Sequence, residues 1–206
     1  MRTYSIEDVK ATLLRCAALT REIEDRLTEI DSLNGDGDLG VSMAKGMEAI
    51  EKTVSAFTGT SVSQLFLQCG MAFNRAAPST MGTLIGMSFM SVGNAWKNVS
   101  EIGEAEIAAL PSLMAEAIAK FGNAKPGDKT VLDALCPFAQ TLKSEYEASG
   151  NFAGAYALAV EAAKAGMEST KGMQPRVGRA RWLGERAIQN YDGGAVLCAY
   201  LLEKLQ

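Results

Sequence analysis

The sequence of 206 residues contains no histidine. Without an imidazole, the usual general base near neutral pH is missing, and every histidine-based catalytic triad is excluded. Cysteine is also scarce, and no two cysteines stand at the C-x-x-C spacing. These two features together argue against a structural zinc site. We interpret the four cysteines as buried small hydrophobic residues in a reducing compartment: Cys16, Cys69, Cys136 and Cys198.

Long apolar runs are missing as well. The longest candidate, residues 153–167, is interrupted by Glu161 and Lys164, whereas a membrane-spanning helix needs about 20 apolar residues. Residues 1–10 lack the apolar core of a secretion signal. The net charge of −4 argues against charge-driven binding to nucleic acid or to an anionic membrane. We therefore expect a cytoplasmic protein with neither a nucleic-acid nor a membrane partner.

Apolar residues recur at helical spacing along most of the chain, and no run of alternating β-branched residues predicts a strand. Ser5 with Asp8 is a predicted N-cap pair, and Ser61 with Gln64 is a predicted capping box. Short turns between helices are typical of antiparallel neighbours. The sequence therefore predicts an all-α fold without strands, a bundle of about eight antiparallel helices, in one domain covering residues 1–206. The glycine clusters, including Gly82 with Gly86, are expected at helix junctions or ends.

The segment 31–40 carries three carboxylates, Asp31, Asp36 and Asp38. Like charges this close repel one another unless a cation neutralises them, and oxygen ligands suit Mg²⁺ or Ca²⁺. An EF-hand is excluded, because position 12 counted from Asp36 is Met47 rather than glutamate. Mg²⁺ shared between one or two carboxylates and nucleotide phosphates fits the loop better. The alternative is a solvated polar turn in which the aspartates cap helices.

The segment 122–130 nearly matches a phosphate-binding P-loop, but it carries one residue too many, Asp128, before Lys-Thr. A P-loop also needs a preceding strand, and none is predicted here. We therefore interpret the segment as a Gly-Pro turn in which Asp128 caps the next helix.

The segment 178–186 is basic and carries three arginines. The planar guanidinium group suits phosphate, since it offers paired N–H donors. We expect this role for Arg179. For Arg181 and Arg186, a surface salt bridge with Glu185 is the preferred interpretation.

The three segments together resemble the L subunit of dihydroxyacetone kinase (DhaL), the ADP- or ATP-binding partner of the substrate-binding K subunit. The matching blocks are D-x4-D-G-D at 31–38, K-P-G-D-K-T at 125–130 and G-R-A-x-x-L-G-E-R at 178–186, followed by Asp192. They occur in the family's order and span most of the chain. The combination of K-P-G-D-K-T with L-G-E-R is specific to this family.

The resemblance implies a barrel of eight antiparallel helices that binds nucleotide at one end through two Mg²⁺ ions. It places the metal-binding carboxylates at Asp31, Asp36 and Asp38, with no catalytic residue beyond them. The implied nucleotide contacts are Leu39, Gly40, Val41, Ser42, Thr80, Met81, Gly122, Val131, Arg179, Asp192, Gly193 and Gly194.

The activity implied by the resemblance is transfer of a phosphoryl group from Mg²⁺-bound nucleotide to dihydroxyacetone held by a K-type subunit. A phosphotransferase-system carrier, the M subunit, is a possible donor that rephosphorylates ADP. Leu39 replaces the family's usual histidine, and the stretch 81–86 lacks its usual proline. The acceptor therefore stays open between dihydroxyacetone and another short ketose or polyol. The alternative function is a nucleotide-loaded adaptor that regulates a partner without turnover.

Overall fold

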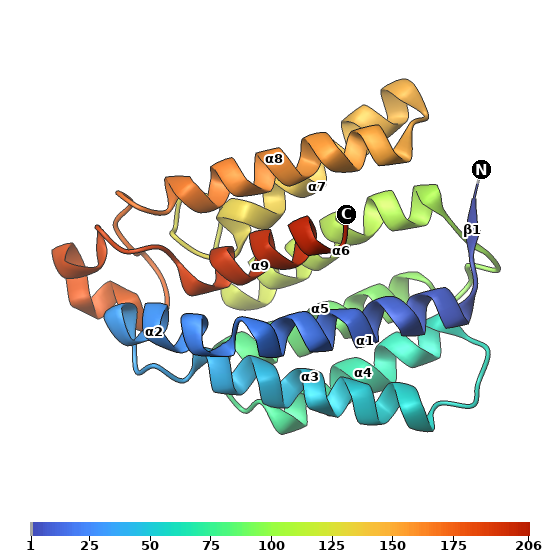
Figure 1. The fold of residues 1–206 in the computed structure, drawn as a ribbon, viewed down its shortest axis with the longest axis horizontal. Coiled ribbons are helices and arrows are strands. Elements are labelled where there is room, and N and C mark those ends of the chain that lie inside the picture. The colour runs from blue at the N-terminus through green and yellow to red at the C-terminus, as the bar shows by residue number, and fades with distance from the viewer. Residues whose placement is uncertain (1) are drawn as a thin grey trace.

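Helices dominate the computed structural model, which describes residues 2–206 (Figure 1). The helices are α1 (Ile6–Glu22), α2 (Glu24–Asn34), α3 (Leu39–Ala56), α4 (Val62–Ala76), α5 (Thr80–Ala95), α6 (Glu104–Gly122), α7 (Leu132–Ser149), α8 (Phe152–Ser169), the 3₁₀ helix η1 (Arg179–Ala187) and α9 (Gly193–Lys204).

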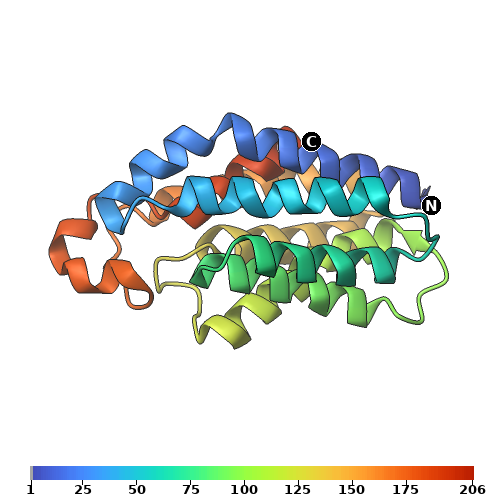
Figure 2. The same cartoon turned by 90° about the horizontal axis from the view of Figure 1, so that it is seen from below.

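The α-helices form a closed up-and-down bundle (Figure 2). Each helix from α3 to α9 packs against the one before it, and α9 returns to contact α1 and α2. A single residue, Ile23, separates α1 from α2, and Leu27 N still bonds to Ile23 O at 2.9 Å. Counting α1 and α2 as one bent helix gives the expected set of eight. The predicted all-α fold is confirmed.

The prediction of no strands was wrong on one point. β1 (Thr3–Tyr4) and β2 (Ile102–Gly103) pair in an antiparallel ladder, with Thr3 opposite Gly103. Strands of two residues are too short to produce the alternating pattern from which strands are predicted. Their pairing ties the N-terminus to the start of α6 (Figure 1).

Both predicted N-caps are present, but the capping box predicted at Ser61 forms only in part, since no bond from Ser61 N to the Gln64 side chain occurs among the described residues. Ser5 Oγ accepts from Asp8 N at 3.2 Å, and Ser5 N donates to Asp8 Oδ2 at 2.8 Å, which completes a capping box at the start of α1. Ser61 Oγ accepts from Gln64 N at 3.3 Å at the start of α4. Local sequence thus determines where these helices begin.

Not every glycine marks a helix end, and the expectation for Gly86 was wrong. Gly86 is buried inside α5, and a Cβ there would lie 2.9 Å from Gly70 O and 2.8 Å from Asn74 Cβ on α4. The residue is therefore small because the backbones of α4 and α5 approach closely. Helix packing selects glycine at this position, and no turn is involved.

Gly86→Ala should lower the free energy of unfolding by about 1–3 kcal/mol, the usual cost of overpacking a well-filled interface. This cost exceeds the gain of roughly 0.5–1 kcal/mol expected from placing alanine in a helix. Thermal denaturation followed by circular dichroism measures the change, which should appear as a fall of several degrees in Tm. A Tm equal to that of the wild type would show that α4 and α5 can move apart at little cost.

The cysteines only partly match the expectation of burial. Cys69 is buried, whereas the other three are partly exposed, and none of the four forms a disulfide in the described chain. Burial raises the pKa of the Cys16 thiol to about 11 and those of Cys69 and Cys198 to about 12. These thiols are therefore protonated and unreactive near neutral pH.

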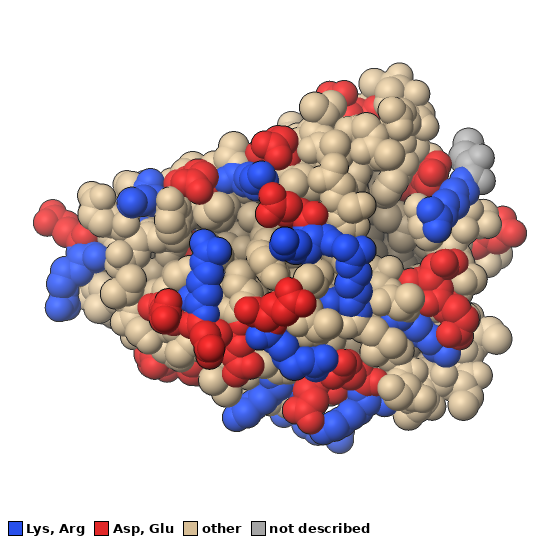
Figure 3. Space-filling model, viewed as in Figure 1, with Lys and Arg blue, Asp and Glu red and all other residues tan. Residues whose placement is uncertain are grey.

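The surface carries charges of both signs. On the face shown in Figure 3, acidic and basic side chains are interspersed, which agrees with the small net charge. Among residues 2–206, no helix combines the length and the apolar character that crossing a bilayer requires.

Candidate functional site

Three carboxylates converge at the end of the bundle where α2 leads into α3. Asp31 lies in the last turn of α2, and Asp36 and Asp38 lie in the connection that follows. One oxygen of each lies within 4.8 Å of one oxygen of each of the others. Gly37 permits the turn, since its φ is +74° and a Cβ there would lie 2.5 Å from Ser32 Oγ. Carboxylate oxygens at this spacing fit a hard divalent cation such as Mg²⁺.

Arg179 approaches the same carboxylates from the segment between α8 and α9. It is the first residue of η1, and its Nη1 pairs with Asp36 and lies 3.9 Å from Asp38 Oδ2. About half of each side chain is exposed, so these pairs contribute little to stability. The pairs instead place the Arg179 guanidinium group beside the candidate cation site, where it is suited to bind phosphate oxygens.

The two other arginines of η1 do not match their expected role. In the part of the chain that the structure describes, neither Arg181 nor Arg186 forms an ion pair with Glu185. Instead, the Arg181 guanidinium lies 4.3 Å from the ring centroid of Trp182, which is 76% exposed. Stacking on an aromatic face is a common alternative partner for arginine.

The N-termini of α3, α5, α7 and α9 lie at the same end of the bundle as the carboxylates. A Cβ on Gly193 would lie 2.5 Å from the Leu39 side chain, so the first turns of α9 and α3 touch. A Cβ on Gly194 would lie 2.8 Å from Met81 and 3.2 Å from Val131, which brings in the starts of α5 and α7. Each N-terminus contributes the positive end of a helix dipole. Their convergence favours the binding of an anion such as phosphate.

The other predicted nucleotide residues lie at this same end. Gly40 packs α3 closely against α2, because a Cβ there would collide with the Glu24 carbonyl. Leu39, at the position of the family's usual histidine, is buried. The remaining members are in the first turn of α3, at the exposed start of α5 and at the end of α6: Val41, Ser42, Thr80 and Gly122.

Asp192 is the most electrostatically perturbed group near the site. Its Oδ1 accepts from Ala195 N at 2.8 Å and so caps α9. Burial raises its pKa to about 7, and the charges of Asp133 and Asp31 add to this effect, whereas Ala195 N and Lys129 oppose it. Near neutral pH, the protonated and the charged form of the Asp192 carboxyl are therefore both populated.

The loop between α6 and α7 differs from its prediction. The element that leads into it is the helix α6 and not a strand, as expected, but Asp128 does not cap α7. Asp128 Oδ2 accepts from Lys125 N at 2.9 Å and closes its own turn. Asp133 bonds the loop instead, accepting from Thr130 N at 2.7 Å and from Gly127 N at 2.5 Å. Asp133, in the first turn of α7, thus holds the loop, and no side chain of the described residues caps the helix in the way predicted for Asp128.

Sequence reasoning also missed Lys129, which is 4% exposed and whose φ is +62°. Its ammonium group donates to four backbone carbonyls of the segment that contains η1. The only signal in the sequence was a lysine between aspartate and threonine in an otherwise polar turn. Such a lysine is usually solvated, so composition could not reveal its burial.

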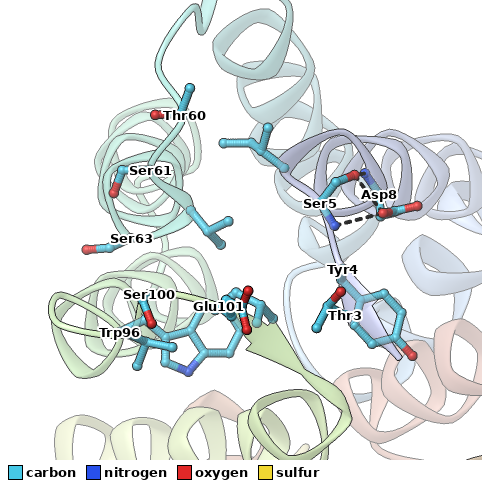
Figure 4. Close-up of a pocket in the computed structure, with 14 residues that line it drawn as sticks. Thr3, Tyr4, Ser5, Asp8, Thr60, Ser61, Ser63, Trp96, Ser100 and Glu101 are labelled. Atoms are coloured by element: carbon cyan, nitrogen blue, oxygen red, sulfur yellow. Dashed lines mark hydrogen bonds between the residues drawn. The ribbon is translucent and has the colours of Figure 1, made fainter. Parts of the chain in front are cut away.

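A cavity of about 500 Å³ lies at the opposite end of the bundle (Figure 4). Polar side chains line it, but several already have partners within the fold. Ser5 and Asp8 form the capping box, Ser61 caps α4, and Ser63 donates to Gly93 O at 2.7 Å. The convergence of charge is at the other end, and we place the candidate site there.

Comparison with known proteins gives one family match and several relatives. The DAK2 domain model matches residues 34–206. A D-erythrulose kinase of Mycolicibacterium smegmatis is 33% identical over 183 residues, which cover 86% of this chain and 32% of the kinase. The chain thus spans about a third of that relative. The ADP-binding subunit DhaL of a phosphotransferase-system-dependent dihydroxyacetone kinase from Lactococcus lactis is 32% identical, over 87% of this chain and 85% of the subunit.

Among solved structures, the fold is similar to part of the dihydroxyacetone kinase of C. freundii in complex with AMP-PNP and Mg²⁺. The TM-score is 0.77, and the match covers 100% of this chain and 34% of the kinase at 22% sequence identity. At this identity the likeness establishes the fold.

Proposed function

Since this chain belongs to the DAK2 domain family, we propose that it binds ADP or ATP with Mg²⁺ and acts as the nucleotide-binding part of a kinase. One observation carries the proposal. Three carboxylates, one arginine and four helix N-termini lie at the same end of the bundle. This combination suits a diphosphate or triphosphate, since a cation would neutralise its charge and N–H donors would hold its oxygens.

The side chains divide the work of binding. Asp31, Asp36 and Asp38 would hold Mg²⁺, as two ions, through their carboxylate oxygens. When bound, Mg²⁺ supplies positive charge that reduces the repulsion between phosphate oxygens and an incoming hydroxyl. Arg179 would exchange its carboxylate partners for phosphate oxygens once a cation neutralises the aspartates. Phosphoryl transfer needs mainly this positioning and charge compensation from a protein.

The acceptor would be held by another polypeptide or domain. This chain contains no histidine, the residue to which the family's K subunit tethers dihydroxyacetone. The relatives include both a dihydroxyacetone kinase subunit and a D-erythrulose kinase. We therefore propose a short ketose of three or four carbons as the acceptor, with ATP or a phosphorylated M-type carrier as the phosphoryl donor.

A reconstituted assay tests this function. The chain is mixed with a K-type subunit, Mg²⁺ and either ATP or a phosphorylated carrier with ADP, and phosphorylated dihydroxyacetone and erythrulose are measured. We expect product with at least one ketose and one donor, and none without Mg²⁺. Tight nucleotide binding without any product would favour the alternative, a nucleotide-loaded adaptor. Absence of both binding and product would refute the proposed function.

A further inference from the structure

The connection between α8 and α9, residues 170–192, carries Arg179 to the site and is held by one buried ammonium group. Lys129 Nζ donates to Ala187 O and Asn190 O at 2.6 Å, and to Met173 O and Ile188 O at 3.2 Å. Lys129 itself lies on the loop between α6 and α7, and it is 4% exposed. Four carbonyls of residues 173–190 therefore converge on the ammonium group of Lys129.

These carbonyls come from both ends of the connection. Met173 lies before η1, whereas Ala187, Ile188 and Asn190 lie at its end or just after it. Two backbone bonds support the closure, Gly172 N to Ile188 O at 2.8 Å and Arg176 N to Asp128 O at 3.1 Å. The ammonium group thus joins the two ends of a loop whose middle part carries Arg179.

Few other side-chain bonds hold this connection against the bundle. Asn190 Nδ2 donates to Leu33 O at 3.3 Å, Asn34 Nδ2 donates to Tyr191 O at 2.7 Å, and Tyr191 Oη donates to Glu168 Oε2 at 2.8 Å, all near its end. The middle part reaches the rest of the protein through packing of η1 on α2 and through the pairs that Arg179 forms with Asp36 and Asp38. Those pairs are about half exposed and weak. Lys129 is the strongest fixed point of the loop, because bonds to a buried charged donor are worth more than exposed pairs.

We propose that Lys129 is a positioning residue of the nucleotide site, which holds residues 173–190 closed so that Arg179 lies beside Asp36 and Asp38. This role rests on the proposed nucleotide-binding function. Lys129 does not touch the nucleotide in this proposal, and it acts through Arg179. A methionine in its place would fill similar volume but would leave the four carbonyls without their shared donor.

Limited proteolysis with trypsin tests the closure without any nucleotide. The connection contains four arginines, Arg176, Arg179, Arg181 and Arg186. In Lys129→Met, cleavage after these residues should be about tenfold faster or more, since loss of charge-assisted bonds raises the open population by at least that factor. Lys125→Met removes an exposed lysine from the same loop and should be cleaved as slowly as the wild type.

Titration calorimetry with Mg·ADP tests the link to Arg179. The wild type, Lys129→Met, Arg179→Ala and the double variant form a double-mutant cycle. Each single variant should bind about tenfold more weakly or worse, as expected for loss of one charge-assisted contact to phosphate. The double variant should bind no more weakly than Arg179→Ala alone. Additive losses, or an unchanged affinity of Lys129→Met, would overturn the proposed positioning role.

The two proposals fail in different ways. A wild-type chain that does not bind Mg·ADP refutes the nucleotide-binding function, whereas a binding wild type with unaffected Lys129→Met refutes only the positioning role. If Lys129→Met does not fold, Lys129→Arg retains the cation with altered geometry and enters the same cycle, with an intermediate loss of affinity expected. Failure of both variants to fold would also overturn the proposal, since Lys129 would then support the whole bundle.

Discussion

Asp36→Ala should weaken the binding of Mg·ADP by more than about 100-fold. Loss of a residue that only supports a metal ligand typically costs about 10–100-fold in metal affinity, and Asp36 would be a ligand itself. The variant also removes the partner of Arg179. Titration calorimetry at constant Mg²⁺ measures the affinity, and product formation in the reconstituted assay should fall in parallel.

Asp25→Ala is the matched control for this variant. Asp25 is exposed on α2, the helix that leads into the connection carrying Asp36, so its replacement removes the same charge from a neighbouring part of the chain. Its nucleotide affinity should remain within about twofold of the wild type, as expected for a screened surface charge. Asp36→Ala without nucleotide should retain the wild-type Tm within a few degrees, because its ion pair is exposed. Equal affinities of the two variants would show that Asp36 does not bind the cation.

Saturating Mg·ADP should raise the Tm of the chain by about 5–10 °C. A ligand at 100 times its Kd stabilises the folded state by about 2.7 kcal/mol, and each kcal/mol shifts the Tm of a chain this long by about 2–4 °C. The shift should increase with the logarithm of nucleotide concentration. Differential scanning fluorimetry at several concentrations measures it.

Chelation of Mg²⁺ separates the role of the cation from that of the helix N-termini. With EDTA present, ADP should produce almost no shift, because three carboxylates with one arginine beside them keep a net negative charge that repels the diphosphate. EDTA alone should leave the Tm of the nucleotide-free chain unchanged. A full shift with ADP and EDTA would mean that the nucleotide binds without the aspartate-held cation. Unchanged melting with saturating Mg·ADP would contradict nucleotide binding altogether.

The fold could be predicted largely because its signals are local. Helical periodicity and the caps at Ser5 and Ser61 depend on residues three or four positions apart, and the structure confirms them. The strands β1 and β2 could not be predicted, since each is only two residues long. Gly86 was misinterpreted because its small size serves contact with a neighbouring helix, a relation between residues distant in sequence.

In the candidate site, too, local features could be predicted, whereas contacts between residues distant in sequence could not. The cluster of Asp31, Asp36 and Asp38 could be predicted because all three residues lie within one short segment, and the structure brings them together. Their role as metal ligands stays a prediction. The burial of Lys129 depends on carbonyls 44 to 61 positions away, and no local pattern encodes that distance. Asp128 and Asp133 compete for the same turn, and which one bonds it depends on backbone geometry.

The alternating direction of the helices has a consequence for how this end of the bundle can diversify. Because α3, α5, α7 and α9 all begin there, much of the attraction for phosphate comes from main-chain polarity, which no single substitution removes. Side chains at the rim are then free to change without loss of that attraction. On the proposed function, the chain path would hold the phosphate end of a nucleotide and leave recognition of its other half to side chains at the rim.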